Sequence, residues 1–323
     1  MTESASGMKP VMYHYVRPGA EGLPHFPYLS LADFERQLED FATTHGFVGR
    51  DAFAAWTAGG PAPSGVLLTF DDGLRDHIDF VLPALKARGL FGLFYVSSGP
   101  AVTGRILDVH KVHLALGRLG GERVLAWLEA NAAELLPEAG MRGESSPHYA
   151  GQVSDEATKF VKRLFNWDLS GEERGAVLEA LLDHAFAGSP PPWQDFYLDQ
   201  QALRELSRAG MGVGPHSHTH AVSAELSPQR QREEVELSCE FVELHGGSRA
   251  WGYCYPHGLA ASFSPETERA VAAAGCPMAF AVEARDIAAP LAEERRYALP
   301  RHNCNAFPHG TASYGGDEAA SAT

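Results

Sequence analysis

The sequence has few cysteines and lacks any long hydrophobic run. Four cysteines occur among 323 residues, and no two of them form a C-x-x-C pair. That spacing suits neither a disulfide framework nor a cysteine-rich zinc site, so reduced, mostly buried thiols are expected. No stretch of about 18 uninterrupted apolar residues occurs, and the N-terminus lacks the basic and apolar segments of a secretory signal. We therefore expect a cytoplasmic protein without a membrane-spanning helix.

Positive charge is also scarce. The chain has 26 lysines and arginines against 41 acidic residues, which gives a formal net charge of −15. This balance argues against a nucleic-acid backbone or an anionic membrane surface as the main partner. A local basic pocket can still lie on an acidic protein, so a nucleotide-linked substrate stays compatible with the charge. The sequence gives no indication of the oligomeric state.

What the sequence does contain is an alternation of short apolar runs with helical patterns, which is typical of parallel strands joined by helices. The continuous run VLLTF at 66–70, between Gly65 and an acidic pair, predicts a buried strand. Similar runs predict further strands at 11–16, 91–96, 211–214, 252–255, 279–282 and 298–300. About seven or eight strands with interleaved helices favour a parallel α/β barrel that need not be complete.

This rhythm changes between about residues 100 and 195. Amphipathic helices are expected within 107–135 and 155–187, with a stretch rich in Gly, Ser and Pro between them. We interpret the region as a largely helical insertion, placed where barrel enzymes build lids and substrate walls. The expected organisation is one barrel domain over 1–310 that contains this insertion, followed by a small, polar, disordered tail at 311–323.

The first candidate motif is Thr69-Phe70-Asp71-Asp72-Gly73, at the C-terminal end of the expected strand 66–70. Adjacent carboxylates repel each other and are costly near a core, and the glycine permits a turn that points both into a cleft. Catalytic residues of barrel enzymes collect at such strand ends. The alternative is an ordinary solvated Asp-Asp-Gly turn.

The second motif is His216-Ser217-His218-Thr219-His220, just after the expected strand 211–214. A spacing of four residues brings His216 and His220 to one side of a tight turn, whereas His218 is out of phase. Two neutral imidazoles with one carboxylate can hold a catalytic zinc that keeps an open position. The alternative is a polar loop that happens to be rich in histidine.

The third motif, Cys254-Tyr255-Pro256-His257-Gly258, also follows an expected strand. Its Pro and Gly define a turn whose backbone N–H groups can face a cleft and stabilise an oxyanion. An ordinary turn that ends a strand is the alternative.

In this order, the three motifs resemble those of the polysaccharide deacetylase (carbohydrate esterase family 4) superfamily. The resemblance extends to Met12-Tyr13-His14-Tyr15 near the start and to Leu299-Pro300-Arg301 near the end, and it covers most of the chain outside the insertion. The segment LDVHK at 107–111 resembles a cytoplasmic-type branch with a helical insertion. The fold implied is a deformed (β/α) barrel of about seven or eight strands.

The resemblance implies a metal centre and a base. Asp72, His216 and His220 would be the metal ligands, and Asp71 would be the general base beside them. Zinc is the metal expected from these ligand types, although an Asp/His/His site also accepts cobalt, nickel, iron or manganese.

The resemblance also implies an oxyanion donor, an acid and substrate contacts. The backbone at Tyr255 would be the donor, and His14 would be the catalytic acid, with His302 as the alternative acid. Substrate contacts are expected from Tyr255, Pro256, His257 and Arg301.

The sequence departs from the family pattern at two places. His257 stands where many relatives carry an aromatic residue, and Arg301-His302-Asn303 replaces an arginine that is followed by a motif containing aspartate. We expect the missing carboxylate to affect how the base is oriented or tuned.

The resemblance therefore implies a metal-dependent hydrolase that acts on the C–N bond of a linear amide and removes an N-acyl group, acetyl being expected, from an amino sugar or glycan. A deformylase using the same site is the first alternative, because the metal motif does not distinguish acetyl from formyl. The second alternative is a catalytically impaired glycan-binding protein on the same scaffold.

Overall fold

The computed structural model describes residues 7–136, 154–169 and 171–316, which form two compact units. The first, called the sheet unit, consists of the described residues within 1–18, 29–105 and 193–312. The second, called the helical unit, consists of those within 19–28, 106–192 and 313–323. The helical unit therefore includes 19–28 and 313–316, two segments outside the insertion expected at 100–195.

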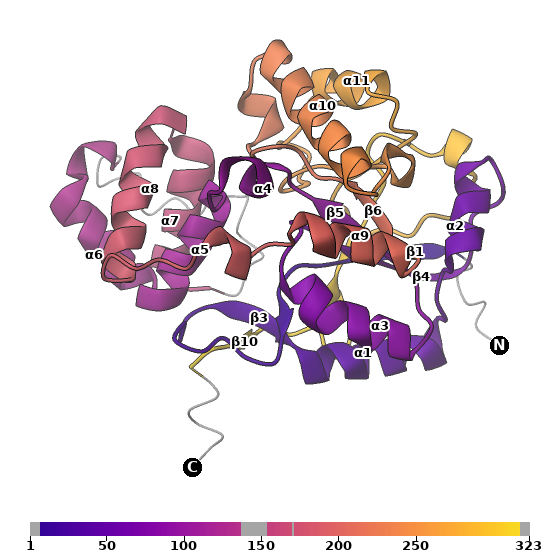
Figure 1. Ribbon diagram of the computed structural model, residues 1–323, viewed down its shortest axis with the longest axis horizontal. Helices are drawn as coiled ribbons and strands as arrows, with labels where there is room; N and C mark the ends of the chain where they lie inside the picture. The colour runs from indigo at the N-terminus through magenta and orange to yellow at the C-terminus, as the bar shows by residue number, and fades with distance from the viewer. Residues whose placement is uncertain (1–6, 137–153, 170, 317–323) are drawn as a thin grey trace. The chain divides into compact units, whose positions relative to one another are not determined.

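A five-stranded parallel sheet lies at the centre of the sheet unit (Figure 1). Its order is β6-β5-β4-β1-β9, and every neighbouring pair is parallel. The strands are β1 (Met8–Tyr13), β4 (Gly65–Phe70), β5 (Gly92–Val96), β6 (Gly212–Pro215) and β9 (His302–Asn303). The register pairs Tyr13 with Phe70 and Val96 with Pro215, so the carboxyl ends of four strands lie along one edge.

Two further strands, β7 (Tyr253–Cys254) and β8 (Ala279–Phe280), form a separate parallel pair. Phe280 makes a parallel bridge to Leu299, and the same segment enters the large sheet as β9 soon afterwards. Between β6 and β7 no ladder joins the described strands. The expected α/β fold with parallel strands is thus confirmed. The series of hydrogen-bonded strands is interrupted between β6 and β7. The strand expected at 298–300 is reduced to the bridge at Leu299.

The central strand β4 is buried on both faces, as its continuous apolar run predicted. Leu68 and Phe70 pack with Phe34 and other helix residues in one core cluster. Leu67 packs instead with residues of other strands, including Phe280. Because strand side chains alternate, Thr69 and Asp71 continue the face of Leu67 and point toward the strands, not toward the helices.

Helices cover the outer side of these strands, with α10 and α11 packed together (Figure 1). The helices of the sheet unit are α1 (Leu31–Thr44), α2 (Arg50–Thr57), α3 (Leu82–Ala87), α4 (Gly99–Thr103), α9 (Gln200–Arg208), α10 (Pro228–Leu244) and α11 (Pro265–Ala273). Several begin at the caps that the sequence indicated. Ser30, for example, accepts a hydrogen bond from the Asp33 N–H at the start of α1.

The helical unit has a core of its own. It is built from α5 (Asp108–Leu119), α6 (Gly121–Asn131), α7 (Glu156–Arg163) and α8 (Gly171–Ala185). Leu116, Leu128, Phe160 and Leu181 are buried together between these helices. Across the described ranges, every helix is too short or too polar to span a bilayer.

Short strands complete the fold. β2 (Val16–Arg17) pairs in parallel with β3 (Pro27–Ser30), and β10 (Ser313–Tyr314) pairs antiparallel with β3. The expectation of a disordered tail at 311–323 did not anticipate β10, and residues 317–323 lie outside the described residues.

One buried histidine links the fold to the candidate site. His77 begins a short π-helical turn (His77–Val81) and is completely buried against the rings of Phe70 and Phe94. Its Nε2 lies 3.0 Å from the carbonyl oxygen of His14. Burial lowers the pKa of His77 to about 4, and the hydrogen bond to His14 offsets this only in part.

This lowered pKa predicts a pH-dependent stability. The stability that neutral His77 contributes is fully present above its unfolded pKa of about 6.5 and is lost as the pH falls toward about 4, because only the unfolded chain then takes up the proton. When the pH is lowered from about 7.5 to about 5, the wild type should lose unfolding free energy. His77→Gln should lose about 2 kcal/mol less, because it lacks this titrating group. Urea titrations at both pH values test this, and parallel losses in the two proteins would contradict it.

Candidate metal centre and active site

The candidate site is built where the chain leaves β4 and β6. Asp72 follows β4 with a φ of 76°, and Gly73 follows it with a φ of 66°. A Cβ at Gly73 would lie 2.8 Å from the Cγ1 of Val96, so only glycine fits there. In the loop after β6, Ser217 and His220 have φ values of 64° and 61°. Left-handed non-glycine residues are costly and tend to gather at functional sites, which makes this edge of the sheet the candidate.

These turns bring the three expected metal ligands together. The Oδ1 of Asp72 lies 3.2 Å from the Nε2 of His216 and 3.1 Å from the Nε2 of His220. All three side chains are buried. Ligand atoms about 2 Å from a tetrahedral zinc lie roughly 3.3 Å from one another, so the spacing of these atoms fits one ion.

The far side of the His216 ring is also held. Its Nδ1 lies 2.8 Å from the carbonyl oxygen of Cys254. A carbonyl only accepts hydrogen bonds, so Nδ1 carries the proton and the Nε2 lone pair points toward Asp72. This is the arrangement in which a histidine ligates a metal.

Glu234 of α10 holds the histidine loop from behind, and sequence reasoning missed it. Its buried carboxylate accepts hydrogen bonds from the backbone N–H groups of His218 (2.9 Å) and Thr219 (2.7 Å), and from the Thr219 hydroxyl (2.8 Å). The Oγ of Ser217 accepts from the N–H of His220 at 3.0 Å. The out-of-phase His218 places its Nδ1 2.8 Å from the Oγ of Ser98. No sequence motif marks Glu234. Its role is apparent only from its burial and from its contacts with residues distant in the sequence.

The neighbouring aspartate, Asp71, lies in a different environment. The two terminal nitrogens of Arg301 donate to its two oxygens, each at 2.7 Å, and both side chains are buried. The Sγ of Cys254 lies 3.6 Å from each of these oxygens. Burial favours the neutral acid, but the charge and hydrogen bonds of Arg301 prevail and lower the pKa of Asp71 to about 2. Asp71 is therefore an ionised carboxylate in a fixed orientation.

Arg301 is buried and engaged with several protein groups. The side chain is 1% exposed, and besides Asp71 it donates to the Thr69 hydroxyl and the Ala281 carbonyl, each at 3.2 Å. The guanidinium therefore holds both oxygens of Asp71, and the substrate contact expected of Arg301 stays a prediction. The sequence lacks a carboxylate that the family pattern has after the arginine. In its absence, the ion pair with Arg301 fixes the orientation of Asp71.

His302 faces the other way. Side chains alternate along an extended strand, so the residue after the inward-pointing Arg301 points outward. The Nε2 of His302 lies 2.8 Å from Asp286, which also pairs with Lys9. His302, the alternative catalytic acid in the sequence analysis, therefore pairs with Asp286 and points away from Asp71.

His14 lies beside the three candidate metal ligands Asp72, His216 and His220. Its Nε2 lies 4.0 Å from the Oδ2 of Asp72, and its side chain is 39% exposed. Since its carbonyl is held by His77, the backbone is fixed while the ring reaches the cluster from the solvent side.

Tyr255 is not placed as expected. Its N–H donates to the carbonyl oxygen of Phe280 at 3.1 Å within the β7–β8 pair, so it is not available to an oxyanion. Its ring is buried and stacks on Phe263 at 4.1 Å. Pro256 has no N–H, and the next residue, His257, has a φ of 59° and a ring 4.9 Å from that of His220. Of the residues expected to contact substrate, His257 has its ring against that of the candidate ligand His220.

Among the described residues, a second group could also share an ion. It consists of Asp71, His216 and Cys254. The oxygens of Asp71 already accept from Arg301, whose positive charge opposes a cation there. The donor set around Asp72 is therefore the better metal site.

The contacts of Glu234 lead to a testable prediction. Partners that orient metal ligands typically contribute about 10- to 100-fold to metal affinity. We expect Glu234→Gln to weaken Co²⁺ binding by about this factor, because the amide cannot accept all three hydrogen bonds in the same way. Glu233→Gln on the same helix, where the carboxylate pairs with Arg230 near the surface, is the matched control. Equal Co²⁺ affinities in a chelator competition would contradict the role of Glu234.

Comparison with known proteins adds to this geometry. Residues 178–279 match the family model "Polysaccharide deacetylase", a range that contains the histidine motif and the turn at 254–258 but not Asp71 and Asp72. The search of curated proteins found no match.

Solved structures share the fold over nearly the whole chain. The Streptococcus pyogenes deacetylase PplD in complex with acetate is 16% identical, with a TM-score of 0.54 and coverage of 93% of each chain. IcaB from Ammonifex degensii is 17% identical, with a TM-score of 0.53 and coverage of 92% of this chain and 91% of that one. A de-N-acetylase from Aggregatibacter actinomycetemcomitans is 13% identical, with a TM-score of 0.51 and coverage of 97% and 98%. The segment 178–279 thus resembles a polysaccharide deacetylase, and the fold of the chain is similar to that of these solved structures.

Proposed function

We propose that this protein is a metal-dependent deacetylase that removes the N-acetyl group from an amino sugar, either free or within a glycan. The observation that carries the proposal is the convergence of Asp72, His216 and His220 next to the ionised Asp71. The similar structures include a deacetylase in complex with acetate and a de-N-acetylase, which supports this choice of acyl group.

Asp72, His216 and His220 would hold the metal. When bound, a zinc ion polarises a carbonyl and lowers the pKa of a water ligand to about 7. Zinc suits one carboxylate and two imidazoles best, although cobalt, nickel, iron or manganese also suits such a set.

Asp71 would accept the proton of the attacking water. Its low pKa keeps it ionised throughout the neutral range, and Arg301 prevents it from rotating. A carboxylate of low pKa is a weak base, but it need hold the proton only briefly. The departing amine is a far stronger base, so the overall transfer is downhill.

His14 would supply the proton that the leaving nitrogen needs, because an amide anion is too basic to depart. It lies within 4.0 Å of Asp72 and is partly exposed, so it can take up protons from solvent. His302 is not proposed, since its ring is paired with Asp286.

The Tyr255 N–H is not proposed as the oxyanion donor, because it donates to the carbonyl oxygen of Phe280 within the β7–β8 pair.

The acyl group and the sugar are open to direct assay. Amine release from N-acetylglucosamine, N-formylglucosamine and short N-acetylated oligosaccharides distinguishes a deacetylase from a deformylase. It also shows whether a free sugar or a glycan is preferred. Faster release from the formyl compound at equal concentration would replace the proposal by the deformylase alternative.

The two aspartates and the histidines are expected to have separable roles. Asp71→Asn should retain bound metal and lose about 10²- to 10⁴-fold in turnover, the range typical of a lost general base. His216→Ala should lose the metal itself. Metal content by mass spectrometry and amine release measure both effects, with the exposed Asp79→Asn as the control. Equal metal content and activity in the Asp71 and His216 variants would exclude these roles.

The pair between Asp71 and Arg301 leads to a second prediction. Because the pKa of Asp71 lies below its ordinary value of 3.8, the stability of the ionised pair is present above that value and is lost as the pH falls through about 2. Arg301→Met removes the main influence that lowers the pKa of Asp71, so burial should raise that pKa and the acid limb of kcat/KM should move to higher pH.

Arg301→Lys should restore part of that shift, because the charge remains while the second hydrogen bond is lost. Arg295→Met removes an exposed arginine that pairs with Glu268, and it should leave the profile unchanged. An acid limb that does not move in Arg301→Met, in protein whose circular dichroism is native, would contradict the tuning of Asp71.

A further inference from the structure

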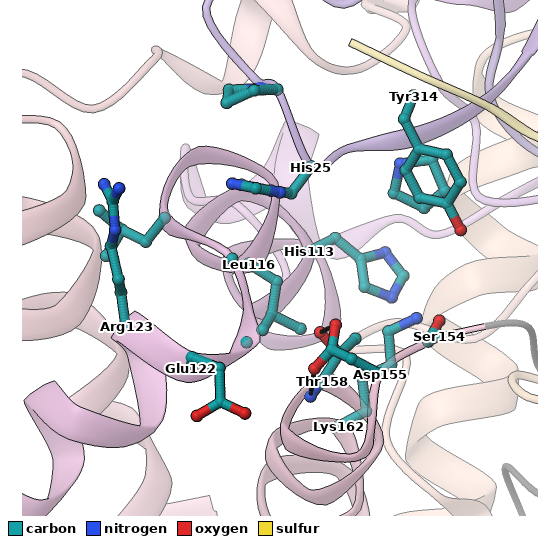
Figure 2. A pocket seen from close by; sticks show the side chains of 15 residues that line it. His25, His113, Leu116, Glu122, Arg123, Ser154, Asp155, Thr158, Lys162 and Tyr314 are labelled. Atoms are coloured by element: carbon teal, nitrogen blue, oxygen red, sulfur yellow. Dashed lines mark hydrogen bonds between the residues drawn. The ribbon is translucent and has the colours of Figure 1, made fainter. Parts of the chain in front are cut away.

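The helical unit contains a pocket of about 580 Å³ whose lining charges are matched (Figure 2). Two cationic side chains, Arg123 and Lys162, line it together with two carboxylates, Glu122 and Asp155. Figure 2 shows Arg123 on the opposite side from Lys162. The pocket therefore favours neither an anion nor a cation. A more distinctive pair of reactive groups lies in the sheet unit.

Two cysteine thiols meet in the core between α10 and α11, which pack against each other (Figure 1). Cys239 lies on α10, and Cys276 lies in the turn that follows α11. Their Sγ atoms are 3.7 Å apart, and both side chains are buried. They belong to one apolar core cluster, which includes Val235, Val271 and Ala274. The two thiols are therefore in direct contact and shielded from water.

Polar contacts hold the turn that carries Cys276 against α10. Arg249 pairs with Glu243, near the end of α10, through two hydrogen bonds of 2.7 Å. The same guanidinium donates to the carbonyl oxygen of Ala274, two residues before Cys276. The N–H of Cys276 itself donates to the carbonyl oxygen of Val271 at 3.3 Å. These contacts position one thiol against the other, which gives the pair a high effective concentration for reaction with each other.

A covalent bond between the two sulfurs needs only a small movement. An S–S bond is about 2 Å long, so the sulfurs must approach from 3.7 Å to about 2 Å. The turn is not tightly packed at Gly275, where an added Cβ would have its nearest neighbour, the Cδ of Arg249, at 3.6 Å. A shift of this size is therefore compatible with the packing at the turn.

The other two cysteines have different surroundings. The Sγ of Cys254 lies 3.6 Å from each carboxylate oxygen of Asp71, and Cys304 is partly exposed. Within the described ranges, neither Cys239 nor Cys276 is part of a group of three or more side chains that could share a metal ion. A reaction between these two thiols is thus favoured over metal binding.

We propose that Cys239 and Cys276 form a disulfide in the presence of a small disulfide such as oxidised glutathione. One protein thiolate attacks glutathione disulfide, which gives a mixed disulfide and releases one glutathione. The second protein thiolate then attacks the protein sulfur of the mixed disulfide, which gives the protein S–S bond and releases the other glutathione. The protein thiols lose two electrons and two protons, and glutathione disulfide takes up both as it becomes two molecules of glutathione.

The bond closes a loop that contains β7, the turn 254–258 and α11. It also secures α10, whose Glu234 accepts three hydrogen bonds from the histidine loop. A cross-linked chain has fewer conformations when it unfolds, so the oxidised protein is more stable than the reduced one. This site goes beyond the proposed deacetylase function and does not depend on it.

Burial makes the reaction slow while the core is closed. The hydrogen bond with Cys276, together with burial, raises the pKa of the Cys239 thiol, so little thiolate is present near neutral pH. The exchange therefore requires a local opening of the contact between α10 and α11, which urea below the unfolding transition promotes.

The test incubates the full chain with glutathione disulfide in such urea, quenches the reaction with acid and maps the disulfides by mass spectrometry. Cys239 and Cys276 should occur in one cross-linked pair of peptides, and the intact mass should fall by two hydrogens. The same reaction in fully denaturing urea is the comparison, because the native contacts are absent there. In the folded chain, this pairing should be enriched at least about 10-fold over the other pairings.

Oxidation should also shift the unfolding transition. The urea midpoint of the oxidised chain should be about 1 M higher than that of the reduced chain, and dithiothreitol should reverse the shift. Cys239→Ser should show no shift on oxidation, whereas the control Cys304→Ser should behave like the wild type. The comparison of oxidised with reduced wild type needs no variant, so it still decides if Cys239→Ser does not fold.

Several results would overturn the proposal. They are four free thiols after the incubation, a dominant pairing that includes Cys254 or Cys304, or equal pairings in the folded and denatured chains. A midpoint that does not rise on oxidation would also overturn it, because the bond would then strain the native structure. None of these measurements uses amine release, so failure of this proposal and failure of the deacetylase proposal are recognised separately.

Discussion

Two adjacent carboxylates are buried at the end of a core strand, and the rest of the candidate site depends on how their repulsion is resolved. Asp71 points toward the strands and is neutralised by Arg301, which arrives from the far end of the sequence. Asp72 turns away through a left-handed backbone and faces two imidazoles. A buried carboxylate without such a partner would cost several kcal/mol. The two aspartates therefore have different surroundings, and the separate roles proposed for them rest on this difference.

The strained turns at this edge need support from the surrounding structure. Left-handed residues such as Ser217 and His220 cost about 1 to 3 kcal/mol each and persist only when other contacts hold them. Glu234 provides part of this support by accepting three hydrogen bonds from the loop. The candidate site thus depends on a contact from α10 as well as on the ends of the strands.

The comparison with solved structures shows that the fold persists although only 13% to 17% of residues are identical. Parallel strands explain part of this tolerance, because any apolar residue of suitable volume can fill either face of a strand such as β4. The helical unit has a core of its own, separate from those of the sheet unit.

Local patterns in the sequence were sufficient for several features. Apolar runs indicated the strands, the spacing of His216 and His220 indicated that their rings lie on one side, and the Asp71-Asp72-Gly73 turn indicated two carboxylates in a cleft, of which the resemblance singled out Asp72 as a metal ligand. These features depend on neighbouring residues, whose geometry the backbone determines directly.

Other features were decided only by the tertiary structure. The sequence did not reveal that Arg301 points inward and His302 outward, because this depends on the phase in which a short strand enters the sheet. It did not reveal that the Tyr255 N–H is used by Phe280, or that Glu234 reaches the histidine loop, because both contacts join distant segments. The sequence by itself determined which groups can carry the chemistry. The tertiary structure decided which of them meet, because hydrogen bonds and ion pairs between distant residues form only when packing brings those residues together.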